Sequence, residues 1–261
     1  MGIVEAVKKG FSLSGRLTKV VIIFFILNVI MGLVSLPLAR PENAGQPGIA
    51  AISLILSVVF FLVFIFLQGG ALGLVRDLCK SGAAEMSKFS EYGKKYYVKI
   101  LSLLLIYIVI AIALVLILAL IGSGVLAIGD NILTRTIVGA VAAVVTLITI
   151  VVLLFPIYTI VVDEKGVIAS LKKGTKLGWD NFWKVLGLFL VLVLISVLIS
   201  LIIGFVIGLI TVPLPFTVTQ VIITIINSAI QSYIPIVMMI ALMGYYLGLA
   251  KEGPQATTPT A

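Results

Sequence analysis

The chain has 261 residues, of which 62% are apolar and only 11% are charged, and its mean hydropathy is +1.32. A soluble domain has roughly 45–50% apolar and about 25% charged residues, so this composition excludes a water-soluble globular fold. The formal net charge of +8 is concentrated in a few segments between long apolar runs.

Long apolar runs dominate the chain, and six of them approach or exceed the ~20 residues that cross a hydrocarbon core of ~30 Å as a helix. In chain order the runs are Val20–Ala39, Ile49–Val75, Ile100–Ile121, Ile137–Val162, Val185–Val212 and Val221–Ala250. Strands of a membrane barrel alternate apolar and polar residues over about ten positions, whereas these runs are apolar on every face. The sequence therefore predicts an all-α, polytopic bundle of six transmembrane helices.

The first run follows a basic arm, which is also how a signal peptide begins. The run is longer than the ~7–15 apolar residues of a signal-peptide core, so we expect a retained helix. A turn-forming segment, residues 40–47, separates it from the second run.

Basic residues set the expected orientation. Every Lys and Arg except Arg40 and Arg135 falls in the N-terminal arm, in residues 76–99 and 165–184, or at Lys251. The positive-inside rule places these segments, and with them both termini, in the cytoplasm. Because the excess charge then faces the cytoplasmic leaflet, we expect no nucleic-acid partner.

Residues 2–13 (GIVEAVKKGFSL) recur 164 positions later as residues 166–177 (GVIASLKKGTKL), and a weaker copy occupies residues 86–101. Lys19, Lys99 and Lys184 stand in corresponding places at the start of a run. The pattern predicts three repeats, about residues 1–80, 81–163 and 164–251, each an amphipathic interfacial helix followed by a transmembrane hairpin. An even number of spans makes the repeats parallel. All three belong to one transmembrane domain, residues 1–251, followed by a disordered tail, residues 252–261.

The basic segments have apolar and basic arcs at helical spacing, as in helices that lie in a membrane interface. The candidate contacts for anionic lipid are Lys8, Lys9, Arg16, Lys19, Lys94, Lys95, Lys99, Lys172, Lys173, Lys176 and Lys184. Tyr96, Tyr97, Trp179 and Trp183 are the expected interfacial aromatic residues. Ordinary anchoring is the alternative to specific lipid recognition.

Uncharged polar residues are the candidates for a site inside the bilayer. Asn28, Gln68, Asn227 and Gln231 lie within or near the edge of the runs, and the last two share a helix face because they are four residues apart. The amides would either line a cavity or hydrogen-bond between helices. Pro156 and Pro235 are expected to kink the fourth and sixth helices.

Small-residue spacing predicts close helix packing, within the chain or in a homo-oligomer, at the Gly-xxx-Gly pairs 69/73, 204/208 and 244/248. The only cysteine, Cys79, follows the second run and has no internal disulfide partner. A structural thiol or a lipidated one fits this position.

Catalysis is not expected, because acid–base and metal chemistry require titratable groups gathered in a pocket. The chain has no histidine, and its acidic residues stand among lysines at the ends of runs. We therefore expect no enzyme activity, no metal and no cofactor. The lack of charge inside the runs also argues against a proton-coupled pump.

The segment Phe155-Pro156-Ile157-Tyr158, followed by residues 161–166 and by Asn181-Phe182-Trp183, resembles a family of prokaryotic multi-pass proteins. That family includes the membrane domain attached to some glycerophosphoryl diester phosphodiesterases. The resemblance implies a six-helix domain with amphipathic elements in a prokaryotic plasma membrane. It implies no phosphodiesterase activity, because that chemistry belongs to a separate soluble barrel that uses histidine.

Two classes of function fit these patterns. One is a non-catalytic scaffold or accessory protein that interacts with lipids or with another membrane protein. The other is a transporter or lipid-moving protein with a pathway between its repeats. A continuous cavity lined by the amides favours the second class, and amides buried in pairs without a cavity favour the first.

Overall fold

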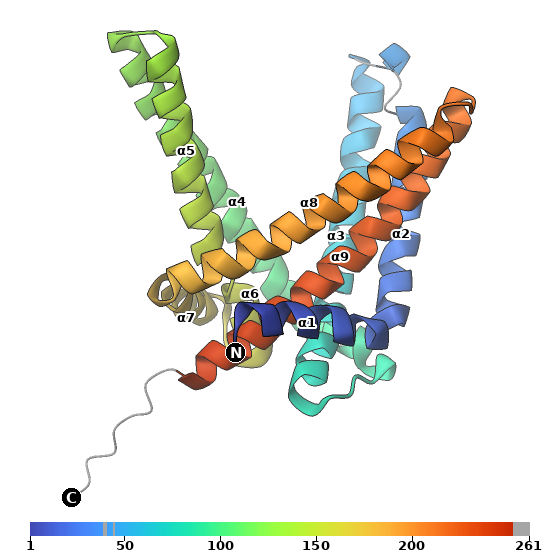
Figure 1. Ribbon diagram of the computed structural model, residues 1–261, viewed down its shortest axis with the longest axis vertical. Helices are drawn as coiled ribbons and strands as arrows, with labels where there is room; N and C mark the ends of the chain where they lie inside the picture. The colour runs from blue at the N-terminus through green and yellow to red at the C-terminus, as the bar shows by residue number, and fades with distance from the viewer. Residues whose placement is uncertain (39–40, 44, 253–261) are drawn as a thin grey trace, which may run out of the picture. The chain divides into compact units, whose positions relative to one another are not determined.

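The computed structural model describes residues 1–38, 41–43 and 45–252, so the predicted tail lies outside the described residues from position 253 onward (Figure 1). All regular elements in the described part of the chain are helical. The α-helices are α1 (Ile3–Ser14), α2 (Thr18–Leu38), α3 (Pro47–Ser81), α4 (Phe89–Ile128), α5 (Ile132–Val152), α6 (Pro156–Val162), α7 (Val167–Asp180), α8 (Phe182–Thr211) and α9 (Phe216–Glu252). Short 3-10 turns occupy Gly15–Leu17, Pro41–Asn43 and Met86–Lys88.

Six helical stretches in the described chain are long and apolar enough to cross a membrane. They contain α2, α3, α4, α5 with α6, α8 and α9, which confirms the prediction of a polytopic helical membrane protein. Helices α3, α4 and α9 have 35, 40 and 37 residues. At 1.5 Å per residue each is longer than the ~30 Å hydrocarbon core, so these helices tilt or extend beyond it.

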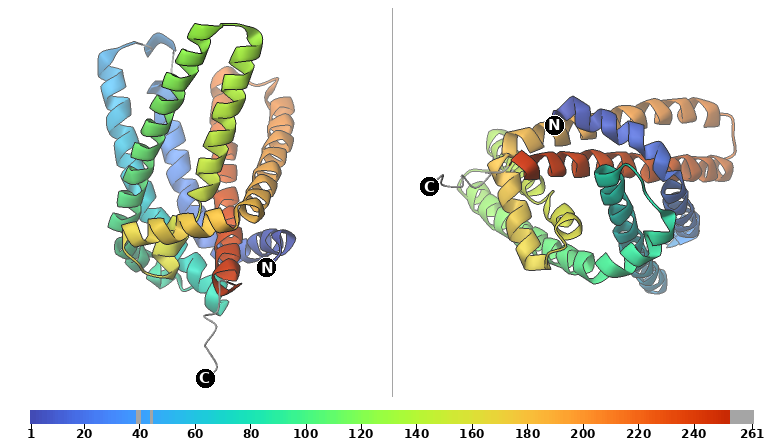
Figure 2. Two further views of the ribbon diagram at one scale, coloured as in Figure 1. Left: turned by 90° about the vertical axis from the view of Figure 1, so that its left-hand side faces the viewer. Right: turned by 90° about the horizontal axis from the view of Figure 1, so that it is seen from below.

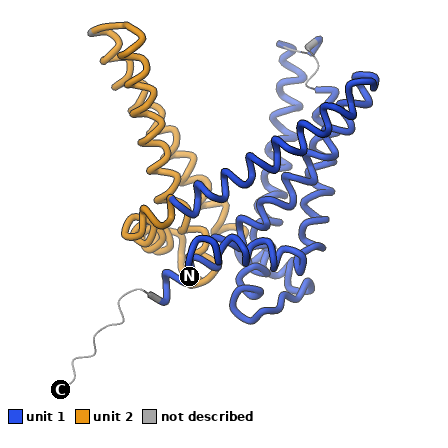
Figure 3. Tube along the Cα trace, in the orientation of Figure 1, with its two compact units in different colours: residues 1–96, 187–261 blue, residues 97–186 orange. Residues whose placement is uncertain are grey.

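The chain divides into two compact units, residues 1–96 with 187–261 and residues 97–186 (Figure 3). Helices α4 and α8 each begin in one unit and continue into the other. The organisation as one transmembrane domain stays a prediction.

In the unit formed by residues 1–96 and 187–261, α9 is the central helix. The most apolar window of α9 is 67% buried, against 11% or less for the other candidate spans. Helices α1, α2 and α3 pack against α9, and Figure 2 shows α1 running beside it. Pro235 lies inside α9, which continues through it as one helix.

In the unit of residues 97–186, the fourth run is not one kinked helix. Helix α5 ends at Val152 and α6 begins at Pro156, so three residues break the helix where the sequence predicts a kink. Proline lacks the N–H that would bond the carbonyl of Val152, and it is well suited to the first position of a new helix. Helix α7 packs on both sides of this break, against α5 and α6.

The α4–α5 hairpin turns at a polar tip, visible in Figure 2. Asn131 caps α5 by accepting a hydrogen bond from the Thr134 N–H. The Arg135 guanidinium lies 2.6 Å from a carboxylate oxygen of Asp130 and holds the pKa of that carboxyl below its usual value of 3.8. This tip is thus fixed by short-range polar contacts in a region where both flanking helices are apolar.

Candidate functional sites

Helix α1 docks on α9 through a face of small residues, Ala6, Gly10 and Ser14, all of which are buried. A Cβ atom on Gly10 would lie 2.7 Å from the carbonyl oxygen of Val237, so only glycine allows this approach. The Ser14 hydroxyl lies 3.1 Å from the Tyr233 hydroxyl and hydrogen-bonds to it. The small face lies beside the arcs of apolar and basic residues, and the sequence analysis did not single it out.

Helix α7 presents the corresponding face, Ser170, Gly174 and Gly178, which is also buried. These residues stand 164 positions after Ala6, Gly10 and Ser14. Gly174 lies directly on the backbone of Phe155 and Pro156, and a Cβ on Gly178 would lie 2.8 Å from the carbonyl oxygen of Val152. The same face therefore packs on the break between α5 and α6.

The beginning of α4 docks on α3 in a related way. A Cβ on Gly70 would lie 2.8 Å from the Phe89 ring, and Gly73 lies against the ring of Tyr92. This segment differs from α1 and α7, which are separate short helices. Phe89 to Ile128 form one continuous helix, α4. Tyr92 also donates a hydrogen bond of 2.6 Å to Asp77, which ties the two helices together.

The three Gly-xxx-Gly pairs have different surroundings. The 69/73 pair receives the beginning of α4, and the 244/248 pair receives Met1 and the Lys9 side chain. Around Gly204 and Gly208, no atom of the described residues lies within 4 Å of a Cβ position apart from chain neighbours and the backbone of α8 itself. Two pairs thus serve packing within the chain, and the 204/208 pair on α8 is open.

The predicted lipid-contacting cations differ in exposure. The exposed ones are Lys8, Arg16, Lys19, Lys94, Lys95, Lys172, Lys173, Lys176 and Lys184, whereas Lys9 and Lys99 are half-buried. Three of the eleven have short contacts that fasten loops: Arg16 to the Gly82 carbonyl at 2.6 Å, Lys173 to Asp163 at 2.7 Å and Lys99 to the Glu164 carbonyl at 3.2 Å.

Two of the four predicted interfacial aromatics, Trp179 and Trp183, are 62% and 80% exposed. Tyr97 is half-buried. Tyr96 differs from the prediction, because it is fully buried and its hydroxyl accepts a hydrogen bond of 2.7 Å from Arg76. Burial against α3 therefore places Tyr96 in the protein interior, where it cannot face lipid headgroups.

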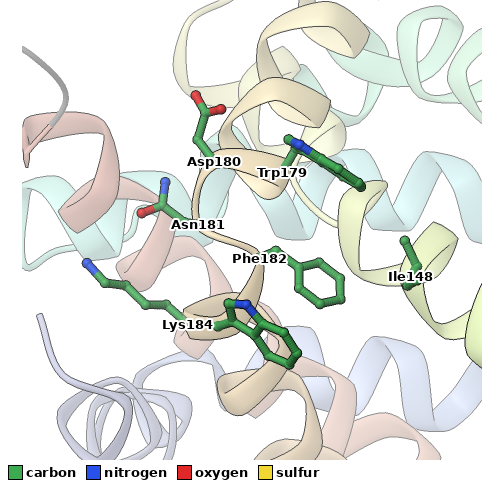
Figure 4. A pocket seen from close by; sticks show the side chains of 7 residues that line it. Ile148, Trp179, Asp180, Asn181, Phe182 and Lys184 are labelled. Carbon is green, nitrogen blue, oxygen red and sulfur yellow. The ribbon is translucent and has the colours of Figure 1, made fainter.

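A cavity of about 480 Å³ opens where α7 meets α8 (Figure 4). Its lining residues are Ile148, Trp179, Asp180, Asn181, Phe182, Trp183 and Lys184. In Figure 4 the rings of Trp179 and Phe182 lie on the side of Ile148, while Asp180, Asn181 and Lys184 extend the other way. One wall is therefore aromatic and the other carries polar and charged groups.

The α7–α8 junction holds this cavity in shape. The Asn181 side-chain amide donates to the Leu177 carbonyl at 3.1 Å and closes the end of α7. The Phe182 ring lies 6.4 Å from the Trp179 ring and 5.3 Å from the Trp183 ring, measured between centroids. Such a sequence of tilted and edge-on contacts is favourable for aromatic rings and orders the three side chains.

A second cavity, of about 270 Å³, lies among α2, α3 and α9. Three of the four predicted amides, Asn28, Gln68 and Gln231, line it, whereas Asn227 does not and is exposed. The Asn28 amide donates to the Ser232 hydroxyl at 2.9 Å. Asn28 therefore does both things that the sequence left open, bonding between helices and lining a cavity.

Metal-binding geometry is not found in the described residues, where no three His, Cys, Asp or Glu side chains gather. The half-buried thiol of Cys79 lies 3.9 Å from the Ile240 carbonyl and faces α9. The polar contacts at the end of α3 join Arg76, Asp77 and the tyrosines of α4, and the sequence analysis did not anticipate them.

Comparison with known proteins identifies one family. The family model described as "Domain of unknown function (DUF7847)" matches residues 1–249, so the chain belongs to this family. No curated protein matches the chain. No solved structure matches it.

Proposed function

We propose that this member of the DUF7847 family is a non-catalytic integral membrane protein that binds anionic lipid and acts as a scaffold or accessory protein. The observation that carries the proposal is the cavity at the α7–α8 junction, with Trp179 and Trp183 exposed beside Lys184. Indole rings prefer the depth of lipid headgroups, and a lysine there attracts anionic lipid by about 1 kcal/mol.

Charge around the cavity supports the same ligand class. Lys172 and Lys176 are exposed on α7, and Asp180 is the one acidic residue that lines the cavity. A phosphate beside Lys184 would meet more cations than anions along α7. Apolar side chains of the short helices, such as Val4 and Ile168, are 68% and 59% exposed, as expected for helices that rest on the membrane interface.

Helix docking supports the proposed threefold repeat. The short element of each segment packs on the end of a hairpin: α1 on α9, the beginning of α4 on α3, and α7 on α5 and α6. In the second and third segments the partner belongs to the preceding hairpin, and in the first it belongs to the last hairpin. This cyclic order of contacts is what three parallel copies of one unit would produce.

Location and ancestry are part of the proposal. The positive-inside rule supports cytoplasmic termini, and the resemblance to prokaryotic multi-pass proteins supports a prokaryotic plasma membrane. Phe155 and Pro156, which begin the segment that resembles the phosphodiesterase-linked membrane domain, lie against Gly174 of α7. The open face of Gly204 and Gly208 on α8 suits a membrane-protein partner or a second copy of the chain.

A second candidate function is lipid movement or transport. The amide cavity among α2, α3 and α9 favours it, because three helices place hydrogen-bonding groups around a hollow inside the predicted spans. This candidate does not depend on the α7–α8 cavity.

Native mass spectrometry of the full chain in nanodiscs tests the anionic-lipid site. Phosphatidylglycerol adducts are expected to outnumber phosphatidylcholine adducts, and Lys184→Gln with Trp183→Ala should lower phosphatidylglycerol binding by about fivefold or more, since ~1 kcal/mol is a factor of about five. Lys251→Gln is the matched control, because it removes one exposed cation far along the sequence from the cavity. Equal loss in both variants, or no preference between the two lipids, would refute the site.

A further inference from the structure

We propose that the amide cavity binds the headgroup of a neutral, hydroxylated lipid of the diacylglycerol class. The inference rests on the second candidate function and names its ligand. The cavity has walls from three helices: Phe24 and Asn28 of α2, Phe64 and Gln68 of α3, and Gln231, Ser232, Pro235, Ile236 and Met239 of α9.

Free hydrogen-bonding capacity points to a ligand with both donors and acceptors. Among the described residues, no hydrogen-bond partner is found for the side-chain amides of Gln68 and Gln231. The Asn28 amide donates one hydrogen bond, to Ser232. The Ser232 hydroxyl donates in turn to the Ser228 carbonyl. The acceptor oxygen of Asn28 and both glutamine amides are thus available to a guest.

Proline adds a further acceptor. Because Pro235 has no N–H, the carbonyl of Gln231, four residues earlier, lacks its usual helical donor. Both residues line the cavity. A hydroxyl group of the guest would satisfy this carbonyl, as polar side chains or water do beside prolines in other membrane helices.

The lining excludes a charged guest. None of the nine lining residues is ionisable, so a phosphate or an ammonium group would have no opposite charge at a depth where unpaired charge is costly. One water occupies about 30 Å³ of liquid, so the cavity of about 270 Å³ has the volume of about nine water molecules, which is enough for a glycerol-sized group. Phe24, Phe64 and Met239 provide an apolar wall for the start of an acyl chain.

The cavity is accessible from the side. Phe64 is 40% exposed, and Gln231 and Pro235 are also exposed, so the lining reaches the surface of the described structure within the predicted spans. A lipid therefore has access that a water-soluble solute lacks at this depth. This lateral access is why we assign a lipid and not a soluble polyol.

A smaller cavity of about 180 Å³ continues the same seam between α2 and α3. It is lined in part by Ser35 of α2 and by Ser53 and Ser57 of α3. Asn28 and Ser35 are two turns apart on one face of α2, or about 10 Å along the helix. Hydroxyl groups thus continue the polar lining towards the α2–α3 connection. A small uncharged headgroup would move along this line of polar groups.

Photolabelling tests the site directly. The full chain is reconstituted in phosphatidylcholine nanodiscs with a diacylglycerol whose diazirine stands near the ester of one acyl chain. We expect labelled peptides that contain Phe24, Phe64 or Met239, and competition by unlabelled diacylglycerol. Gln68→Leu and Gln231→Leu should each reduce labelling by about fivefold, the loss of about one net hydrogen bond.

Asn227→Leu is the matched control, because it removes an exposed amide from the same helix without touching the cavity. Asn28 is kept intact, since its bond to Ser232 joins α2 to α9. Equal labelling of the Gln68→Leu and Asn227→Leu proteins, or equal labelling by a phosphatidic acid with the same diazirine, overturns the proposal. A protein that labels as expected but moves no lipid between leaflets keeps the site and loses the second candidate function.

Discussion

Helices α1 and α7 have the same docking face, yet they pack on two different kinds of partner. Gly10 of α1 lies against Val237 on α9, which stays continuous through Pro235, whereas Gly174 of α7 lies on Pro156 itself, where the helix is broken. The comparison teaches that the small face recognises a close backbone and not a particular helix geometry. The loss of stability when one of its glycines is replaced by alanine should therefore depend on how rigid that backbone is.

The largest effect is expected for Gly174→Ala. The new methyl would overlap the backbone of Phe155 and Pro156, which cannot rotate away as a side chain does. We expect a loss of about 3 kcal/mol in the free energy of unfolding, measured by denaturant titration in detergent. Gly204→Ala, with open space around it, should be neutral or slightly stabilising. Similar values for the two variants would disprove the docking face of α7.

A smaller effect is expected for Gly10→Ala, about 1–2 kcal/mol in the same assay. A Cβ on Gly10 would have one close backbone neighbour, the Val237 carbonyl oxygen at 2.7 Å, and two side-chain carbons at 3.2 and 3.3 Å, whereas all three atoms nearest a Cβ on Gly174 are backbone atoms within 2.8 Å. Gly244→Ala should cost less still, because it meets the flexible ends of Met1 and Lys9. The predicted loss of stability decreases in the order Gly174, Gly10, Gly244, and a larger loss at Gly10 than at Gly174 would contradict it.

The third prediction concerns a contact that only α1 has. Ser14 bonds to the Tyr233 hydroxyl, while the corresponding residue of α7 is Gly178, which has no side chain. Tyr233→Phe should lower the free energy of unfolding by about 1 kcal/mol, and Ser14→Ala by a similar amount. The two losses should not add in the double variant, because one bond is removed. Ser12→Ala, exposed on the same helix, is the control.

The smallest effect belongs to a contact that only α7 has. Lys173 pairs with Asp163 at 2.7 Å, and the two side chains are 41% and 19% exposed. Solvent screens such a pair, so Lys173→Gln should cost less than about 1 kcal/mol, measured as a shift in melting temperature. The shift should vanish at high salt, and Lys172→Gln should show none. A salt-independent loss would assign Lys173 another role.

Much of the architecture was predictable because the hydrophobicity of a segment is the sum over its own residues and does not depend on which helices lie beside it. The six spans follow from runs longer than the bilayer requires, and the structure differs mainly in extending α3, α4 and α9 beyond those runs. The α1 and α7 docking face was also present in the sequence as small residues at every fourth position. A contrast between apolar and basic residues does not reveal this face, because small residues belong to neither class.

The site was predictable only in part. Helical spacing puts Asn227 and Gln231 on one face, yet the structure leaves Asn227 outside the cavity that Gln231 lines. Two prolines with the same local chemistry have different outcomes, one inside a helix and one at the beginning of a new helix. Tyr96 and Tyr97 are neighbours, but only Tyr96 is fully buried and bonded to Arg76.

That the chain is a helical membrane protein follows from its apolar runs alone, because an apolar helix can be buried in lipid whichever helix lies beside it. The sequence also indicated related segments, since residues 2–13 and 166–177 share one pattern. Which amides face one cavity, and which glycines contact another backbone, depends on how the helices pack. Those outcomes depend on contacts between residues as far apart as Gly10 and Val237, and helix packing sets such contacts at separations that local patterns do not encode.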